Sequence, residues 1–408
     1  MTELSQPARA SRRVIGFPEF VTLMAGMMAL TALSLDMMLP ALPAIGGAFG
    51  VAEANDQQLV VILYLAGFAS GHLISGPLSD RLGRRPVLLG GLVVYAVGGL
   101  LAAAAPSFAT LLAGRVVQGL GASAPRVVAL AVVRDRYAGR GMSRVMSFVM
   151  MVFIVVPVVA PTLGSLVTEF GPWRAIFGIL MLAGAALALW AGLRLEETKP
   201  EGPAVPLSMA VRTVLQTPQS RGYTLAIGFM FGNLMTYVST AEQVFTDVYD
   251  LGRSFTLVFG AIALAMVAAS FSNARIVERV GMRRVGHAGL VAYLGLCLIL
   301  AALGYPEDPP LLLYSLFMAG TFFCFGHIVP NFNALAMEPL GRVAGVGSSL
   351  IGFWMMTGGA VFGAIVGQQF DGTVRPVLIG FTVMAALTLA TVLVTERGRL
   401  FRVTRGDG

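Results

Sequence analysis

The sequence predicts an all-α polytopic membrane protein, with twelve transmembrane helices in two six-helix bundles around a central cavity. Three observations favour this fold class: 56% of the 408 residues are hydrophobic, only 12% are charged, and the mean hydropathy is +0.80. A soluble chain carries about 25% charged residues. The apolar stretches are long and do not alternate with the period of a β-strand, so helices are expected to cross the bilayer.

Each predicted helix is an apolar stretch long enough to span a bilayer. In chain order, the stretches are 18–46, 57–78, 87–105, 108–131, 144–168, 173–194, 221–245, 255–277, 285–303, 310–337, 345–368 and 375–396. The first follows Arg12 and Arg13, as the apolar core of a signal peptide would, but it runs on to Asp36 without a cleavage site. We therefore expect it to be a retained helix.

The placement of basic residues predicts the orientation of these helices. Twenty-three of the 28 lysines and arginines fall on the side of the N-terminus, and only Arg174, Arg253 and Arg375 fall on the other side. Cytoplasmic loops collect lysine and arginine, so both termini are predicted to be cytoplasmic. Because the basic residues alternate with apolar spans, the net charge of +7 orients helices and does not indicate a nucleic-acid partner.

The longest polar stretch, 195–220, is predicted to be a cytoplasmic linker between an N-terminal bundle (1–194) and a C-terminal bundle with a cytoplasmic tail (221–408). Two loops repeat one pattern at an offset of 198 residues. The pairs are Asp80 with Glu278, Arg81 with Arg279, Gly83 with Gly281, and Arg85 with Arg283. Two parallel six-helix repeats are characteristic of one large class of transporters.

The loop Gly76–Pro86 resembles the signature loop of the major facilitator superfamily. Segments 35–43, 115–123, 134–135, 237–239, 330–331 and 344–352 resemble the drug:proton antiporters of its bicyclomycin and chloramphenicol resistance branch. The resemblance implies a transporter of the bacterial inner membrane that exports small, largely apolar drugs by alternating access. It implies a proton as the coupling ion, no cofactor, and a monomer.

The fifth helix departs from the antiporter pattern, which has a Gly-Pro pair followed by a Gly pair. This chain has Ala160 before Pro161 and Ser165 after Gly164. Pro157, Pro161 and Gly164 are predicted to kink the helix. The departure keeps an alternative open: a proton-coupled symporter or exporter of a small metabolite with the same fold. A membrane enzyme is not expected, because the sequence has neither paired catalytic carboxylates nor a metal-binding pattern.

Two charges inside spans are predicted to carry the mechanism, because such charges are costly and usually functional. Asp36 and Arg115 lie at depths of about 15 and 11 Å at 1.5 Å per residue, so they can share one level of the cavity. We expect Asp36 to bind the proton and Arg115 to tune it, by an ion pair that changes during transport. The alternative is a static pair between the first and fourth helices.

Five polar residues within spans are predicted to line the substrate cavity: Gln118, Arg126, Asn233, Tyr237 and Asn331. The alternative for the uncharged residues is an interhelical hydrogen bond, and for Arg126 it is a side chain that extends to the membrane surface. An interhelical hydrogen bond is favoured for His327. Glu242 is left without an assigned role.

The final candidate group is a conformational latch at the cytoplasmic side. Its predicted members are Asp80, Arg81, Gly83, Arg84, Arg85, Arg134 and Asp135. Asp80 is expected either to pair with an arginine or to lie at the N-terminus of the helix that follows Arg342. Making and breaking such contacts would shift the balance between two states.

Overall fold

The computed structural model describes residues 15–137, 145, 155–156, 159–199 and 207–401, and its regular elements are helical. The first group of long helices is α1 (Phe17–Asp36), α3 (Leu59–Leu82), α4 (Arg84–Ala103), α5 (Phe108–Arg136) and α7 (Arg174–Arg194). The second is α9 (Pro218–Gln243), α10 (Phe255–Val280), α11 (Met282–Ala302), α12 (Leu311–Met337), α13 (Ala344–Gly367) and α14 (Arg375–Thr395). Residues 159–170 are also helical.

Shorter helical segments connect these elements. They are η1 (Leu39–Ala41), α2 (Leu42–Phe49), η2 (Ala54–Gln58), α8 (Leu207–Gln216), η3 (Val244–Val248), η4 (Gly252–Ser254) and η5 (Glu338–Val343). Ten segments of the described chain are long and apolar enough to cross a membrane, and they include every predicted span except the fifth and the seventh. The fifth lies partly outside the described residues. The seventh forms as α9, a helix with many polar side chains.

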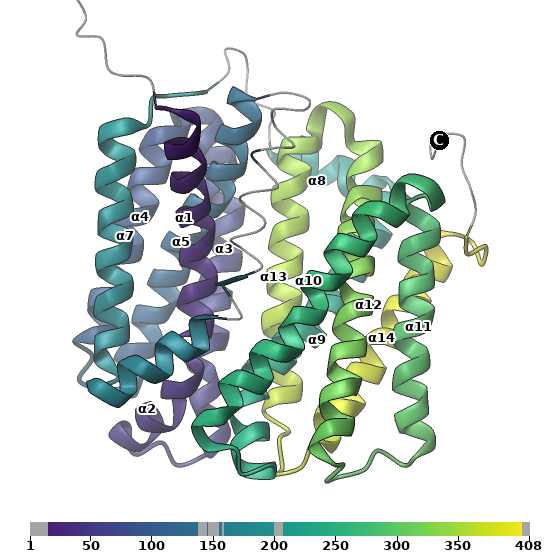
Figure 1. The fold of residues 1–408 in the computed structure, drawn as a ribbon. Helices are drawn as coiled ribbons and strands as arrows, with labels where there is room; N and C mark the ends of the chain where they lie inside the picture. Colours follow the sequence, from purple (N-terminus) through teal and green to yellow (C-terminus); the bar gives the residue numbers. More distant parts are fainter. Residues whose placement is uncertain (1–14, 138–144, 146–154, 157–158, 200–206, 402–408) are drawn as a thin grey trace, which may run out of the picture.

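The long helices form two groups that meet along α3 and α13 (Figure 1). Small residues allow this close contact. A Cβ atom on Gly76 of α3 would lie 2.4 Å from the Ser349 hydroxyl, and one on Gly352 of α13 would lie 3.0 Å from the His72 ring. The outer helices instead expose apolar side chains such as Leu189 and Leu264, as expected for surfaces that face lipid.

The first predicted span is not one continuous helix. Helix α1 ends at Asp36, and the chain then passes through η1 into α2. Pro40 accounts for the break, because a proline ring clashes with the carbonyl four residues earlier, which here belongs to Asp36. Pro43 then lies in the first turn of α2, where its missing N–H has no consequence. The predicted linker 195–220 also contains the helix α8, and α9 begins at Pro218.

The helix groups share two ends, which are defined here by their residues. The arginine-rich end comprises residues 79–85, 134–136, 194–199, 207–221, 279–284 and 338–340. The opposite end comprises residues 46–58, 243–254, 303–310 and 367–375. At the arginine-rich end, the α3–α4 and α10–α11 loops have the same backbone form: Gly83 has φ +109° and Gly281 has φ +89°. These left-handed values favour glycine, so both glycines of the repeated pattern occupy equivalent turns.

Candidate transport site

Asp36 lies at the C-terminal end of α1, where the chain leaves the helix. Its side chain is 5% exposed, and the described residues provide it with neither a hydrogen bond nor an ion pair. Segment η1, which follows it, packs against α9 of the second helix group. A buried carboxylate without a counter-charge is costly, whereas the neutral acid is tolerated. This arrangement places an acid that can accept a proton where the two groups of helices meet.

Arg115 of α5 does not form the expected ion pair with Asp36. Its fully buried guanidinium donates hydrogen bonds to the carbonyls of Ser34 (3.0 Å) and Val60 (2.9 Å) and to Gln118 Oε1 (2.8 Å). The Tyr64 ring centroid lies 4.4 Å from the guanidinium carbon. Backbone carbonyls and a π face therefore replace the predicted carboxylate. The two charges do share one level, because Ser34 is two residues before Asp36.

Gln118 lies next to Arg115 in the interior of the first helix group. It accepts a hydrogen bond from Arg115, and it packs against α4, where a Cβ atom on Gly98 would lie 2.2 Å from the Gln118 backbone nitrogen. The neighbouring Tyr95 hydroxyl of α4 is hydrogen-bonded to Ser34 Oγ at 2.6 Å. Gln118 therefore lies in the packing between α4 and α5, with its side-chain oxygen bonded to Arg115. A role in substrate binding stays a prediction.

Tyr237 of α9 approaches Asp36 from the second helix group. It is close enough to interact electrostatically with the Asp36 carboxylate, and its buried hydroxyl has no hydrogen-bond partner in the described part of the chain. The ring stacks on Phe259 at a centroid distance of 5.2 Å and meets the edge of Phe322 at 4.8 Å. Tyr237 therefore belongs to an aromatic cluster of the second helix group.

The other predicted cavity residues lie farther from this group or at other interfaces. Arg126 is partly buried on α5 and interacts electrostatically with His72. Asn233 donates to the Phe381 carbonyl of α14 at 3.4 Å, so it lies in the packing of the second group. Asn331 donates to Asn273 Oδ1 at 2.6 Å and joins α12 to α10. Their cavity roles stay predictions.

His327 and Glu242 also lie in buried positions. His327 Nε2 forms a hydrogen bond with Ser272 Oγ of α10 at 2.8 Å, which is the interhelical contact favoured from the sequence. Glu242 lies in the last turn of α9, next to Gln243.

The fifth predicted helix contributes one close contact to the site. Pro157 lies outside the described residues, whereas Pro161 and Gly164 lie in the helical segment 159–170. A Cβ atom on Gly164 would be 2.2 Å from the Met37 carbonyl oxygen, directly after Asp36. Gly164 is therefore needed for the approach of this helix to the end of α1. The predicted kink is not tested by this contact.

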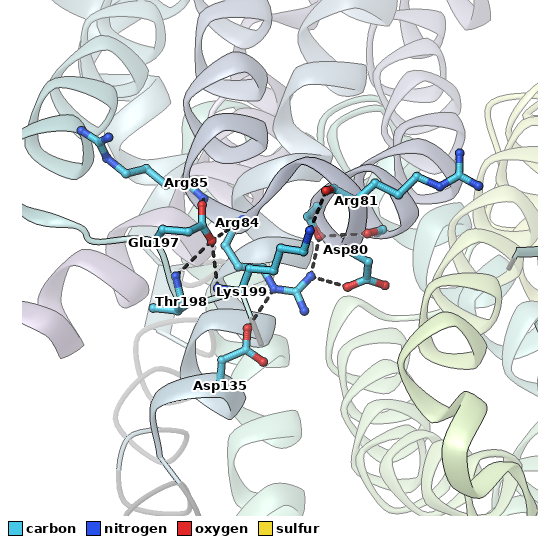
Figure 2. A network of polar contacts seen from close by, with 10 residues as sticks. Asp80, Arg81, Arg84, Arg85, Asp135, Glu197, Thr198 and Lys199 are labelled. Atoms are coloured by element: carbon cyan, nitrogen blue, oxygen red, sulfur yellow. Dashed lines mark hydrogen bonds and ion pairs between the residues drawn. The ribbon is translucent and has the colours of Figure 1, made fainter. Parts of the chain in front are cut away.

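At the arginine-rich end, Arg84 is the centre of the predicted latch (Figure 2). Its guanidinium forms ion pairs with Asp80, and with Asp135 of α5 at 2.8 Å, and it donates to Ser79 Oγ at 2.8 Å. Asp80 thus pairs with an arginine, one of its two expected arrangements. All these residues belong to α3, α4 and α5, so the network holds the first helix group together.

Glu197, in the segment after α7, is a member of this network that the sequence did not reveal. Its carboxylate accepts the backbone N–H groups of Arg84 (2.7 Å) and Arg85 (3.1 Å) at the start of α4. A Cβ atom on Gly83 would lie 2.5 Å from a carboxylate oxygen of Glu197. Burial raises the pKa of Glu197, but hydrogen bonds from the backbone N–H groups outweigh it and lower the pKa below its ordinary value.

The remaining latch candidates have different surroundings. Arg85 donates to the Gly192 carbonyl of α7 at 2.5 Å. The backbone carbonyl of Arg81 accepts a hydrogen bond from Lys199 Nζ at 2.7 Å, while the Arg81 side chain points away from Glu197 (Figure 2). Arg134 is exposed. These three residues are therefore not part of the Arg84 ion-pair network.

A second polar network lies in the second helix group. Arg283 donates to Glu396 Oε1 at 3.2 Å and to Gln219 Oε1 at 2.9 Å, and it lies 3.7 Å from Glu338. Glu396 follows the last helix of its group, as Glu197 follows α7. In both groups, therefore, a carboxylate after the last long helix contacts the first residues of the third long helix, α4 or α11.

Comparisons with known proteins agree with this architecture. The sequence profile of the Major Facilitator Superfamily matches residues 24–364. The bicyclomycin resistance protein homolog of Haemophilus influenzae is 30% identical, over 91% of this chain and 94% of that protein. The chloramphenicol resistance protein of Pseudomonas aeruginosa is 31% identical, over 89% and 86%. The crystal structure of a D-xylose-proton symporter superposes with a TM-score of 0.73 at 13% identity, over 94% and 98%.

These matches confirm the predicted fold class and the resemblance to drug-resistance transporters. The profile spans both helix groups, and the curated relatives cover nearly the whole chain. The protein is therefore a multi-pass membrane transporter that belongs to the Major Facilitator Superfamily.

Proposed function

We propose that this chain is a proton-driven exporter of small, largely apolar compounds such as antibiotics. It acts as a monomer in the bacterial inner membrane, with an N-terminal bundle (1–194), a linker (195–220) and a C-terminal bundle (221–408). The arginine-rich end and both termini face the cytoplasm. The names of the relatives in Haemophilus and Pseudomonas support export of antibiotics.

Buried Asp36 is the observation that carries the proposal. A carboxyl group without a counter-charge can be protonated or ionised. Each protonation state favours a different arrangement of the two helix groups around it. Asp36 ends α1, and segment η1, which follows it, packs against α9. A change in the charge of Asp36 therefore acts on both helix groups. Proton entry from outside and substrate exit then alternate at this level of the transporter.

Arg115 positions the end of α1 in this mechanism. Its bond to the Ser34 carbonyl fixes the last turn of α1 against α5, two residues before Asp36. The positive charge also favours ionised Asp36 when the two groups approach each other. Arg115 therefore tunes the proton site without serving as its permanent partner.

The aromatic cluster that contains Tyr237 favours an apolar cargo. Tyr237, Phe259 and Phe322 form a connected set of rings on the second helix group. The three rings are buried against one another in the structure. When the transport cycle opens this region, they offer large apolar contacts and few fixed hydrogen bonds, which suits compounds of varied shape.

Transport by the Asp36→Asn variant tests the proposal. The protein is reconstituted in liposomes with an imposed pH gradient, and uptake of chloramphenicol and other apolar antibiotics is measured together with proton flux. We expect at least a tenfold loss of gradient-driven transport and of substrate-dependent proton flux. Asp308→Asn, at an exposed position of the opposite end, is the matched control.

Unchanged proton-coupled transport by Asp36→Asn would overturn the role of Asp36. Substrate movement in the same direction as protons would instead support a symporter, the alternative that the altered fifth helix leaves open.

A further inference from the structure

Four amide side chains connect the two helix groups at the opposite end. Asn55 and Gln58 belong to the first group, and Gln243 and Gln368 to the second. Gln58 Nε2 donates to Gln243 Oε1 and, at 3.0 Å, to the Gly367 carbonyl. Gln243 Nε2 donates to Asn55 Oδ1 at 3.0 Å. We call these four side chains the amide clasp.

Asn55 extends the clasp to the end of α13. Its Nδ2 donates to the carbonyls of Gln368 (3.2 Å) and Phe370 (2.8 Å), and Gln368 Nε2 donates back to the Asn55 carbonyl at 3.0 Å. Every one of these bonds crosses from one helix group to the other. The clasp therefore joins η2 and the start of α3 to the ends of both α9 and α13.

The centre of the clasp is tightly packed. Gln58 is fully buried and Gln243 is 2% exposed. A Cβ atom on Gly367 would lie 2.1 Å from Gln58 Oε1, so the amide occupies the space left by the absent side chain. Buried amides at an interface are costly if they lose their partners. The hydrogen bonds thus make this particular contact between the groups specific.

The clasp is built from neutral groups. Individual hydrogen bonds between helices in membrane proteins are weak. A set of several such bonds can hold an interface closed and still allow it to open during a transport cycle, whereas a buried ion pair would leave two costly charges on opening. This chemistry suits a contact that must form and break repeatedly.

We propose that the amide clasp holds the opposite end closed and that its opening exposes the Asp36 site to the outside. This inference rests on the proposed function for the orientation of that end. Gln243 lies six residues beyond Tyr237 on α9, which is about 9 Å along the helix axis. Helix α9 therefore joins the clasp rigidly to the level of Asp36, so a movement at one is transmitted to the other.

Distance measurements between spin labels test the clasp. Labels are placed at Ala48→Cys on α2, at the opposite end, and at Leu257→Cys in the first turn of α10, next to that end. Both positions are exposed, and they lie in different helix groups. The background carries Cys297→Ala and Cys324→Ala, since these are the two native cysteines. Double electron–electron resonance in lipid nanodiscs then gives the ratio of long to short distances.

Gln58→Leu and Gln243→Leu are the disrupting variants, because leucine keeps a similar volume without an amide. We expect each to raise the ratio of open to closed distances about tenfold, equivalent to about 1.4 kcal/mol. Gln369→Leu is the matched control: Gln369 follows α13 at the same end, its side chain is exposed, and within the described chain it donates to the Ile365 carbonyl of α13 and not to the first helix group. It should leave the ratio unchanged.

A cross-link provides the complementary test. The double variant Asn55→Cys and Gln368→Cys is joined by a short, reducible cross-linker that reacts with both thiols. The cross-link should abolish transport, and reduction of the linker should restore it. Unchanged distances in both leucine variants, or full transport in the cross-linked protein, would overturn the proposal. The distance ratio requires neither a known substrate nor proton coupling, so failure of the clasp is distinguishable from failure of the exporter proposal.

Discussion

Replacement of Arg84 by glutamine is the sharpest test of the network at the arginine-rich end. The Arg84 guanidinium is the cation between Asp80 and Asp135, and the Arg84 and Asp135 side chains are each only 5% exposed. Arg84→Gln removes that charge and leaves the Asp135 carboxylate buried without its counter-ion. The predicted result is a loss of stability in the first helix group.

The size of this loss follows from the burial of the pair. Removal of one partner of a buried ion pair costs about 3–5 kcal/mol, because the other charge is left uncompensated. Asp80 is 27% exposed, so water screens it and its contribution is smaller. We therefore expect Arg84→Gln to lower the free energy of unfolding by about 3 kcal/mol. The double variant with Asp135→Asn should recover about 2 kcal/mol relative to the sum of the single variants.

The assay is a double-mutant cycle measured by unfolding in mixed micelles with increasing SDS, followed by tryptophan fluorescence. Arg134→Gln is the control, because Arg134 is exposed and next to Asp135. A loss below about 1 kcal/mol, the scale of a surface pair, or strictly additive effects of the two substitutions, would refute the structural role of the pair.

Two further predictions concern the turn before α4. Gly83→Ala should lower the free energy of unfolding by about 1–2 kcal/mol because alanine is strained at positive φ, whereas Gly90→Ala, which meets open space within α4, should not destabilise; equal effects in the unfolding assay would contradict this reasoning. Glu197→Gln should lower the free energy of unfolding by about 1 kcal/mol near neutral pH. Since folding lowers the pKa of Glu197, the stabilisation is present above the unfolded pKa of about 4.3 and is lost as pH falls through the folded value; an unfolding difference that persists at lower pH would exclude this origin.

Several elements could be predicted because their signals are local in the chain. Apolar length defined the spans, and the spacing of Asp80, Gly83 and Arg84 identified the loop whose geometry the structure shows. The position of Pro40 was also visible, but the apolar run concealed its effect on α1. The steric clash of a proline ring with the carbonyl four residues earlier is the local signal for a helix end at Asp36.

Other contacts had no clear local signal. The sequence predicts a carboxylate partner for Arg115, because charged residues can be recognised in a sequence. In the structure, the partners of Arg115 are mostly backbone carbonyls. Glu197 was one acid among several in a polar linker. Its only hint was its position after the last span of its half, which Glu396 shares.

The sequence by itself determined the membrane class, the family and the small set of charges within the spans, because hydropathy, charge and loop motifs depend on neighbouring residues. Only the tertiary structure decided the partners of Arg115, the return of Glu197 to the start of α4, and the amide clasp. Apart from the bond between Arg115 and Gln118, those contacts join residues about 50 to more than 300 positions apart. Their geometry depends on how whole helices pack, and every residue offers a backbone carbonyl, so the sequence could not single out the partners.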